Sequence, residues 1–340
     1  MNFNHPGTLM SVAMTKSLKA DCAAIPVRAA ALEKLVKSVP LTYVSRAIPE
    51  VNLDWGGKGT GHEECTRDGE MAYMAAVLFI ATKNQIYAAI AVNIIRAWAT
   101  VNKVWKGNNA LLEAAWSCCS LARAAELLKY TMSDADKSKL KWSETESTFN
   151  KWIDTTIMPV LTLEDIWRWP VIGNWHFSQI CARMQLAILR ENRAEFKWCV
   201  DRYKLAVEKA FVCSKERCGE LSETTRDLTH SAFELGGMTQ VAELAFHQSI
   251  DLWTIFDGRL FDACELQASL LLKEVPKGFE LAEIHTPYGY WCEPVLEIPY
   301  AHFNGRKKRP MPKTAALLAT QRPERYTFHW GLGTVTHFKP

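Results

Sequence analysis

Residues 68–82 read DGEMAYMAAVLFIAT, and residues 85–101 follow almost at once with QIYAAIAVNIIRAWATV. Alanine and large aliphatic side chains dominate both stretches, and neither contains a proline. Such segments predict helices. A connection this short makes two successive helices run antiparallel. We therefore expect a helical hairpin over residues 68–101.

Helical patterns of this kind continue as far as residue 272. Residues 109–130 place apolar side chains three and four positions apart, which is the spacing of an amphipathic helix. Further helices are predicted over residues 175–191, 194–213, 230–256 and 260–272. Short turn-forming clusters separate them, and no repeat of fixed length appears. The fold expected is all-α: an (α/α) toroid, or incomplete barrel, of antiparallel helical hairpins.

The sequence changes character after residue 275. Prolines that interrupt a long helix stand at positions 276, 287, 294, 299, 310, 312 and 323. We expect residues 276–340 to form an extended, aromatic-rich segment that wraps over the helical body of residues 10–275. Short strands are expected near 295–298 and 334–338. The chain of 340 residues, 1–340, would then be one domain.

The composition is that of a globular protein, with 48% hydrophobic and 23% charged residues. A formal net charge of +3 gives no reason to expect nucleic acid as a partner. Basic residues nevertheless gather between Arg306 and Arg325. Aromatic residues crowd the same region, namely Tyr288, Tyr290, Trp291, Tyr300, Phe303, Tyr326, Phe328 and Trp330. This region is either a solvated surface or a rim that attracts a polyanion.

The sequence gives no sign of a membrane segment or a metal site. It lacks a run of about 18 uncharged apolar residues. Its start lacks the pattern of a signal peptide, so the chain is either cytosolic or an exported protein without its signal. Cys22, Cys181 and Cys264 are expected to be core thiols, and Cys213 and Cys218 are candidates for a disulfide. Because no Cys/His spacing matches a zinc site, we expect no metal and no cofactor.

Residues 173–179, GNWHFSQ, open a predicted helix. Asn174 either caps that helix or donates hydrogen bonds to a carboxylate near the helix N-terminus, which favours negative charge. Trp175, Gln179 and His62 are candidates for contacts with a substrate. The glycine-rich residues 51–61 lack the frame of a phosphate-binding loop, and they are expected to form a mobile loop over a cleft.

A second polar segment, residues 225–231 (TRDLTHS), precedes a long apolar helix. His230 has the property required of a base, because the pKa of imidazole lies near neutral pH. A purely structural histidine is the alternative. Asp227 either orients His230 or pairs with Arg226, which is itself a candidate for substrate binding.

A third segment, residues 297–306, reads EIPYAHFNGR. If it is extended, Tyr300 and His302 point to the same side, because side chains alternate along a strand. Tyr300 is then a candidate catalytic residue, and His302 and Arg306 are candidates for substrate binding. A structural role is equally open.

Together these segments contain the residue types that elimination from a uronate requires. The hydrogen at C5 is weakly acidic until the neighbouring carboxylate is neutralised. A base then removes that hydrogen and an acid protonates the departing O4 oxygen, without a metal or a redox cofactor. Catalysis by Asn174, His230 and Tyr300 is therefore the leading hypothesis.

Longer stretches resemble a known group of enzymes. Residues 226–260, RDLTHSAFELGGMTQVAELAFHQSIDLWTIFDGRL, are similar without a gap to a pattern of the alginate-lyase-type superfamily of helical-toroid polysaccharide lyases. The glucuronan lyase branch is the most similar. Further likenesses to that branch span nearly the whole chain: His5-Pro6-Gly7, residues 68–82 with Tyr87 and Trp98, and residues 299–306, 322–324 and 331–336.

This resemblance implies a polysaccharide lyase that cleaves a β-1,4-linked polyuronate, glucuronan or alginate, to leave an unsaturated uronate end. Asn174 would neutralise the carboxylate, helped by Arg226 or His302. His230 and Tyr300 would be the base and the acid, in an order left open. The partner expected is an anionic polysaccharide, with no nucleic acid and no membrane, and a secreted location is expected.

Departures from the better-studied alginate lyases argue against strict mannuronate specificity. Pro170-Val171-Ile172 stand where those enzymes have Asn-Asn-His, and His230 stands where they have tyrosine. Two other functions compete with a lyase. A glycoside hydrolase needs two carboxylates, for which Asp227 with Glu234 or Glu297 could be nominated. The other is a glycan-binding protein that kept the fold without activity.

Overall fold

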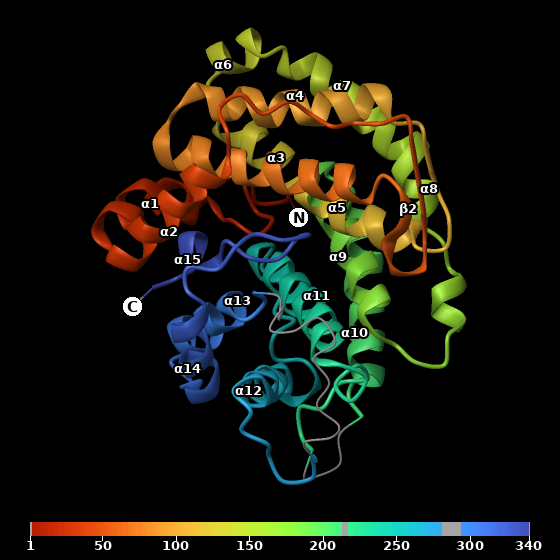
Figure 1. Cartoon of the computed structure of the whole chain (residues 1–340), viewed down its shortest axis with the longest axis vertical. Helices are drawn as coiled ribbons and strands as arrows, with labels where there is room; N and C mark the ends of the chain where they lie inside the picture. The colour runs from red at the N-terminus through yellow and green to blue at the C-terminus, as the bar shows by residue number, and fades with distance from the viewer. Residues whose placement is uncertain (1, 213–216, 281–293, 340) are drawn as a thin grey trace.

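The expected helical hairpin is present as α3 (His62–Thr82) and α4 (Gln85–Val101). The computed structural model describes residues 2–212, 217–280 and 294–339, and it is helical for most of their length (Figure 1). Lys83 ends α3 in a left-handed conformation, and the Asn84 side chain accepts a hydrogen bond from the Ile86 N–H at 3.0 Å to begin α4. The two residues between the helices thus suffice to reverse the chain.

An inner layer consists of α3, α5 (Ala110–Thr131), α9 (Asn174–Leu189) and α11 (Leu228–His247), each packed against the next. These helices are buried on nearly every side; α5, for example, is buried from Ala110 to Leu128. A helix buried all round lies inside a protein rather than on its surface. The inner layer is therefore the core of the molecule.

An outer layer alternates with the inner one along the chain. It comprises α4, α7 (Trp142–Trp152), α10 (Arg193–Ala210) and α12 (Leu260–Leu271). α4 packs on α3, α10 on α9 and α12 on α11, while α7 packs on α4. The outer helix α10 buries one face only, as its amphipathic sequence predicts. This alternation of inner and outer helices confirms the predicted all-α, toroid-type fold.

The ends of the chain meet beside the inner layer. α1 (Val12–Ala24) and α2 (Pro26–Ser38) pack together, and α15 (Gly333–Thr336) contacts both of them (Figure 1). The buried guanidinium of Arg28 in α2 donates to the Val335 carbonyl at 2.5 Å and to the Phe338 carbonyl at 3.2 Å. The N-terminal and C-terminal segments are thereby joined.

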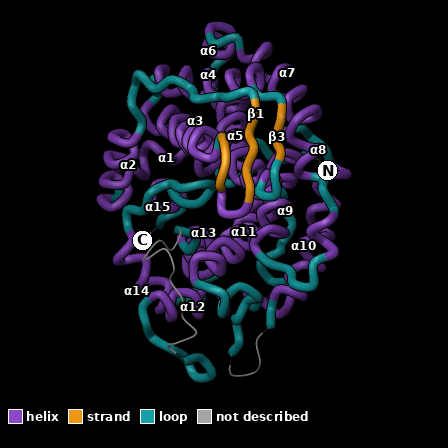
Figure 2. The backbone as a smooth tube through the Cα atoms, turned by 45° about the vertical axis from the view of Figure 1, so that its right-hand side comes forward, coloured by secondary structure: helices purple, strands orange, loops and turns teal. Residues whose placement is uncertain are grey.

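A small sheet packs against the side of the helical body, on α3 and α5. β1 (Glu50–Asp54) pairs antiparallel with β2 (Lys58–Thr60) and parallel with β3 (Val104–Lys106), as Figure 2 shows in orange. The short η1 (Trp55–Gly57) joins β1 to β2. Since β1 packs against both α3 and α5, η1 is held close to the start of those helices.

Short helices connect the longer ones in the part of the chain before α12. They are α6 (Asp134–Lys139), η2 (Ile153–Ile157), α8 (Met158–Leu161), η3 (Asp165–Arg168) and η4 (Phe256–Gly258). The helix predicted over residues 230–256 ends early, at His247. Ser249 takes a left-handed conformation there, and the Ile250 N–H donates to the Ala245 carbonyl at 2.9 Å.

The prediction of short strands near residues 295–298 and 334–338 was wrong, whereas the described part of residues 276–340 does run irregularly between short helices. Helices α13 (Glu297–Tyr300), η6 (Ala301–Arg306), α14 (Pro312–Gln321) and α15 occupy it, and its only strand-like pairing is an isolated bridge between Thr327 and Trp330. Pro312 begins α14, where a missing N–H leaves no hydrogen bond unmade. Proline there starts a helix rather than preventing one. Tyr288, Tyr290 and Trp291 lie outside the described residues.

Two further expectations concern cysteines and membranes. Cys22, Cys181 and Cys264 are buried, as predicted for core thiols. The disulfide considered for Cys213 and Cys218 involves a residue outside the described ranges. Among the helices described, none combines the length and the apolar character needed to cross a membrane.

Candidate active site

A cavity of about 790 Å³ opens where the inner helices begin. His62 is the first residue of α3, Asn109 precedes α5, Asn174 is the first residue of α9, and His230 lies in the first turn of α11; all four line the cavity. Unpaired backbone N–H groups give each helix N-terminus a partial positive charge. Four such ends around one cavity favour an anionic occupant.

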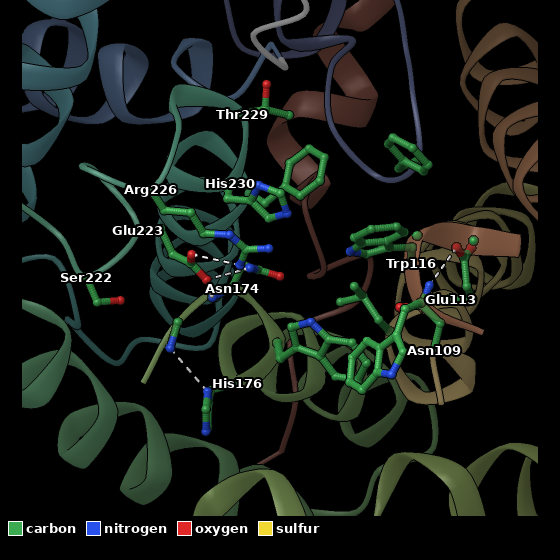
Figure 3. A pocket seen from close by; sticks show the side chains of 18 of the residues that line it. Asn109, Glu113, Trp116, Asn174, His176, Ser222, Glu223, Arg226, Thr229 and His230 are labelled. Atoms are coloured by element: carbon green, nitrogen blue, oxygen red, sulfur yellow. Dashed lines mark hydrogen bonds and ion pairs between the residues drawn. The ribbon is translucent and has the colours of Figure 1, made fainter. Parts of the chain in front are cut away.

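One wall of the cavity is a polar cluster built on Glu223. Its carboxylate accepts a hydrogen bond from Asn174 Nδ2 at 2.7 Å and another from Arg226 Nη1 at 3.1 Å (Figure 3). Asn174 is buried, and its Oδ1 has no hydrogen-bond partner among the described residues. Since Gly173 rather than Asn174 stands at the N-cap, the Asn174 side chain does not cap α9. It is left to interact with a molecule in the cavity.

His230 lies beside this cluster and is fixed by Asp227. The Asp227 carboxylate accepts from the backbone N–H of His230 at 2.7 Å, which caps α11, and its other oxygen lies 2.5 Å from His230 Nδ1. A carboxylate only accepts hydrogen bonds, so Nδ1 carries the proton and Nε2 carries a lone pair. Asp227 thus orients His230, whereas Arg226 pairs with Glu223.

A second histidine–carboxylate pair lies on another wall. His62 Nδ1 is 2.9 Å from Glu113 Oε1, and Asn109 Nδ2 donates to the same oxygen at 3.1 Å. The hydrogen bond that His62 donates to Glu113 raises the pKa of His62. His62 therefore stays protonated to a higher pH than a free histidine and can donate to an acidic ligand.

Aromatic rings form the apolar parts of the cavity. Trp116, Phe233 and Phe328 pack edge to face or tilted, with ring centroids 4.7–5.9 Å apart. Trp175 lies between Trp55 of η1 and Trp169, at 5.6 Å and 5.3 Å. The glycine-rich stretch therefore does reach the cavity, through Trp55, Gly56 and Gly57.

Gln179 and His176, both in α9, hydrogen-bond to the segment that precedes this helix, so their polar groups are already engaged. Gln179 is buried and accepts from Trp167 Nε1 at 2.7 Å, while its amide donates to the Leu161 and Leu163 carbonyls at 2.8 Å. His176 accepts from the Gly173 N–H at 3.2 Å and donates to the Ile166 carbonyl at 2.8 Å. Gln179, predicted to bind substrate, does not line the cavity.

Three other predicted site residues also lie away from this cavity. Arg322 lies over the Tyr300 ring at 5.3 Å, and buried His302 stacks on Trp253 at 4.4 Å. Burial lowers the pKa of His302 to about 4. Arg306 pairs with Glu243 at 2.5 Å. The segment is helical rather than extended, so the alternation used to orient Tyr300 and His302 does not apply.

The structure thus brings together Asn174, Trp175, Arg226, His230 and His62 from the predicted set. Sequence reasoning missed Glu223 and Glu113, which organise the polar groups. Glu223 precedes Arg226 by three positions, a separation too common to signal a contact. Glu113 lies far along the chain from His62, and only the packing of α3 on α5 makes them neighbours.

Comparisons with known proteins agree with this fold. The protein-family model "Alginate lyase" matches residues 52–274. Comparison with curated protein sequences gives no significant match. Among solved structures, alginate lyase A1-III from Sphingomonas species A1 is similar at a TM-score of 0.62 and 15% identity, over 100% of this chain and 98% of that one.

Two more structures extend the comparison. A variant of alginate lyase A1-III complexed with a tetrasaccharide has a TM-score of 0.65 at 14% identity, over 99% of this chain and 96% of its own. An alginate lyase from Bacteroides ovatus has a TM-score of 0.64 at 13% identity, over 98% and 100%. Identities this low establish a shared fold alone. The family match covers well over half of the sequence, and on that ground the chain belongs to the alginate lyase family and is a polysaccharide lyase.

Proposed function

We propose that this lyase cleaves a β-1,4-linked polyuronate, either glucuronan or alginate, by β-elimination. The observation that carries the proposal is the convergence of Asn174, Arg226 and His230 on one cavity at the N-termini of the inner helices. These groups supply a partner for the uronate carboxyl and a base beside it. A polymeric substrate is also the reason to expect the enzyme to act outside the cell.

Asn174 is proposed to hold the uronate carboxyl in its neutral form. One amide hydrogen is committed to Glu223, which leaves the second hydrogen and the unpartnered Oδ1 for a ligand. A donor and an acceptor side by side match a protonated carboxyl group. The negative charge of Glu223 nearby disfavours an ionised one. Neutralising the carboxyl group makes the C5 hydrogen more acidic.

His230 is proposed as the base that removes this hydrogen. Its Nε2 lone pair is available because Asp227 holds the proton on Nδ1. In β-linked glucuronate and mannuronate the C5 hydrogen and O4 lie on the same side of the ring. One imidazole can therefore take the proton from C5 and return it to O4 as that bond breaks. We expect guluronate, in which the two groups lie on opposite sides, to be a poor substrate.

Arg226 and the aromatic rings are proposed to hold the polymer. The Arg226 side chain is about half exposed, at 55%, and can pair with a carboxylate of a neighbouring sugar. Trp55, Trp169 and Trp175 offer flat apolar faces to sugar rings. His62, kept protonated by Glu113, is a further donor to the acidic chain.

The direct test is incubation with glucuronan, polymannuronate, polyguluronate and a glycosaminoglycan. Ultraviolet absorbance of the unsaturated uronate and the number of new reducing ends are followed together. We expect both to rise in parallel with glucuronan or polymannuronate. New reducing ends without the absorbance would indicate hydrolysis. Binding of the polymers with neither signal would mean that the protein binds glycans without cleaving them.

Tyr300→Phe is expected to leave turnover within about twofold of the parent, because Tyr300 does not line the cavity and none of the described residues hydrogen-bonds to its hydroxyl. The measurement is the initial rate of unsaturated uronate formation. A fall in this rate of more than about a hundredfold would mean that Tyr300 is a catalytic residue, as the sequence alone suggested.

Gly173→Ala is expected to lower kcat/KM by about tenfold to a hundredfold, the loss of one or two hydrogen bonds to a charged group. A Cβ at Gly173 would lie 2.5 Å from Glu223 Oε1, so the carboxylate must move away from Asn174. Gly305→Ala is the matched control, because a Cβ there meets nothing within 4 Å. Equal rates for the two variants would mean that Glu223 does not need its present position.

A further inference from the structure

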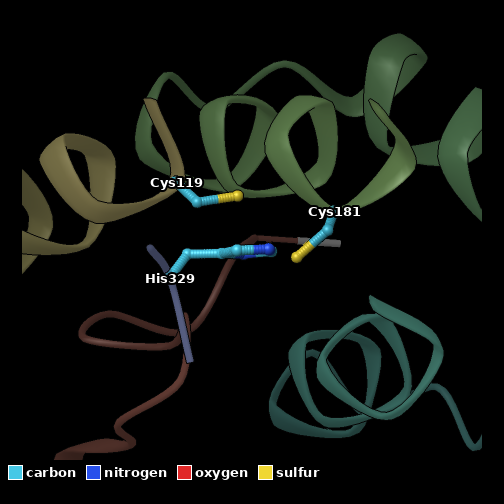
Figure 4. A group of neighbouring side chains, drawn as sticks. All are labelled: Cys119, Cys181 and His329. Carbon is cyan, nitrogen blue, oxygen red and sulfur yellow. The ribbon is translucent and has the colours of Figure 1, made fainter. Parts of the chain in front are cut away.

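Three metal-ligating side chains from distant parts of the sequence meet in the buried interior of the protein. Cys119 comes from α5, Cys181 from α9, and His329 from the loop that follows α14 (Figure 4). Their two sulfurs and a ring nitrogen lie within 4.8 Å of one another, and all three residues are buried. Sequence spacing gives no hint of this cluster.

His329 is the first sign that the cluster is incomplete without a ligand. The residue is 0% exposed, and neither ring nitrogen has a hydrogen-bond partner in the part of the chain that the structure describes. A buried polar group left unpaired is destabilising. The backbone that carries the ring is held in place, because the His329 carbonyl accepts from Arg123 Nη1 at 2.6 Å and from Gln240 Nε2 at 2.9 Å.

Arg123 is the second sign. It is fully buried, and none of the described carboxylates lies within ion-pair distance of it. Its guanidinium instead donates to Gln185, Gln240, the Tyr326 hydroxyl and the His329 carbonyl. A buried positive charge without a carboxylate favours a nearby anion, and the thiolate, which such a charge stabilises, is the form in which cysteine binds metals.

We propose that Cys119, Cys181 and His329 bind one thiophilic d10 metal ion, Zn²⁺ or Cu⁺, as a structural site. Bond lengths of about 2.0–2.3 Å place the ligand atoms of such a site about 3.5–4 Å apart, so small side-chain rotations would bring the three onto one ion. Two thiol protons leave as the metal–sulfur bonds form, and the imidazole binds in its neutral form.

The two candidate ions differ in what they need. Zn²⁺ favours four ligands, and Gln240 Oε1, 3.4 Å from Cys181 Sγ, is the neighbouring oxygen that could complete the set. Cu⁺ is soft and suits thiolate ligands. Two thiolates and Cu⁺ carry one net negative charge, which the Arg123 guanidinium would neutralise.

The role assigned to the ion is to tie three parts of the fold together. It would join α5 and α9 to the loop that carries Phe328, a lining residue of the cavity next to His329 in sequence. The elimination proposed above does not use it. The site can therefore exist whether or not the proposed substrate is right.

The test uses the full-length protein, reduced and stripped of metal, then titrated separately with Zn²⁺ and Cu⁺. We expect about one equivalent of one of these ions to bind and to raise Tm by about 5 °C or more. Cys119→Ala and His329→Ala should lose both effects. Cys118→Ala is the matched control, because Cys118 is equally buried on the same helix but outside the cluster.

Should the variants fail to fold, the parent protein still decides the question. Co²⁺ bound at this site must show a thiolate-to-metal charge-transfer band in the near ultraviolet. Absence of that band together with substoichiometric zinc and copper would overturn the proposal. So would equal metal content in Cys118→Ala and Cys119→Ala, or a Cys119–Cys181 disulfide found by mass spectrometry of alkylated protein that was never exposed to reductant.

Discussion

Replacing His230 with alanine is expected to lower kcat by about 10²–10⁴-fold, the range of a lost general base. The imidazole lies at the cavity with Nδ1 on Asp227. Of the other two histidines that line the cavity, His62 is paired with Glu113, and both ring nitrogens of His176 are hydrogen-bonded to the backbone. Turnover is followed by the ultraviolet absorbance of the unsaturated product. KM should change little, because the imidazole acts on one C5 hydrogen and binds little of the polymer.

Asp227→Asn is the companion variant. It tests whether Asp227 is needed to orient His230 without also removing the cap of α11. Asparagine caps a helix about as well as aspartate, so α11 should remain intact. Its amide can donate to Nδ1, however, which would place the imidazole proton on Nε2 and remove the lone pair. We expect kcat to fall while Tm stays near that of the parent. His230→Ala turnover within about threefold of the parent would remove His230 from the mechanism.

Local sequence was sufficient to predict the inner helices and the outer helices α4, α10 and α12, but not α1, α2, α7 or the small sheet. The α3–α4 hairpin follows from two apolar stretches and a two-residue turn. The later helices that were predicted also follow from apolar stretches separated by short turns. The segment after residue 275 could not be predicted in this way. Its prolines were interpreted as breakers, whereas Pro312 starts α14 and Pro299 falls in the first turns of α13. Proline is disfavoured in the interior of a helix, but it is compatible with the first turn.

The site was predictable where polar residues open an apolar helix. Asn174 and His230 stand at such positions, and inner helices that start on the same side bring them to one cavity. The extended backbone assumed in orienting Tyr300 and His302 is not present, and Tyr300 is not among the residues that line the cavity. Glu223, Glu113 and the Cys119–Cys181–His329 cluster arise from contacts between distant segments. No local pattern encodes such contacts.

Asn174→Ala is expected to lower kcat by about 10²–10³-fold, the effect of deleting one group that stabilises developing negative charge. When the C5 hydrogen leaves, charge spreads onto the carboxyl group. The amide of Asn174 is buried at the place where we propose that this group binds. Asn174→Asp should be at least as damaging, because a second carboxylate next to Glu223 would repel the uronate.

Asn192→Ala is the control for this series, because Asn192 also stands at a helix start but only caps it. Its Oδ1 accepts from the Glu195 N–H at 3.1 Å, away from the cavity. The variant should lose about 1 kcal/mol of stability and keep its turnover. Asn174→Ala should show the opposite pattern, with a small change in Tm and a large one in kcat. If Asn174→Ala instead lost stability and kept its rate, Asn174 would be a structural residue, and the carboxyl group would have to be neutralised by another residue.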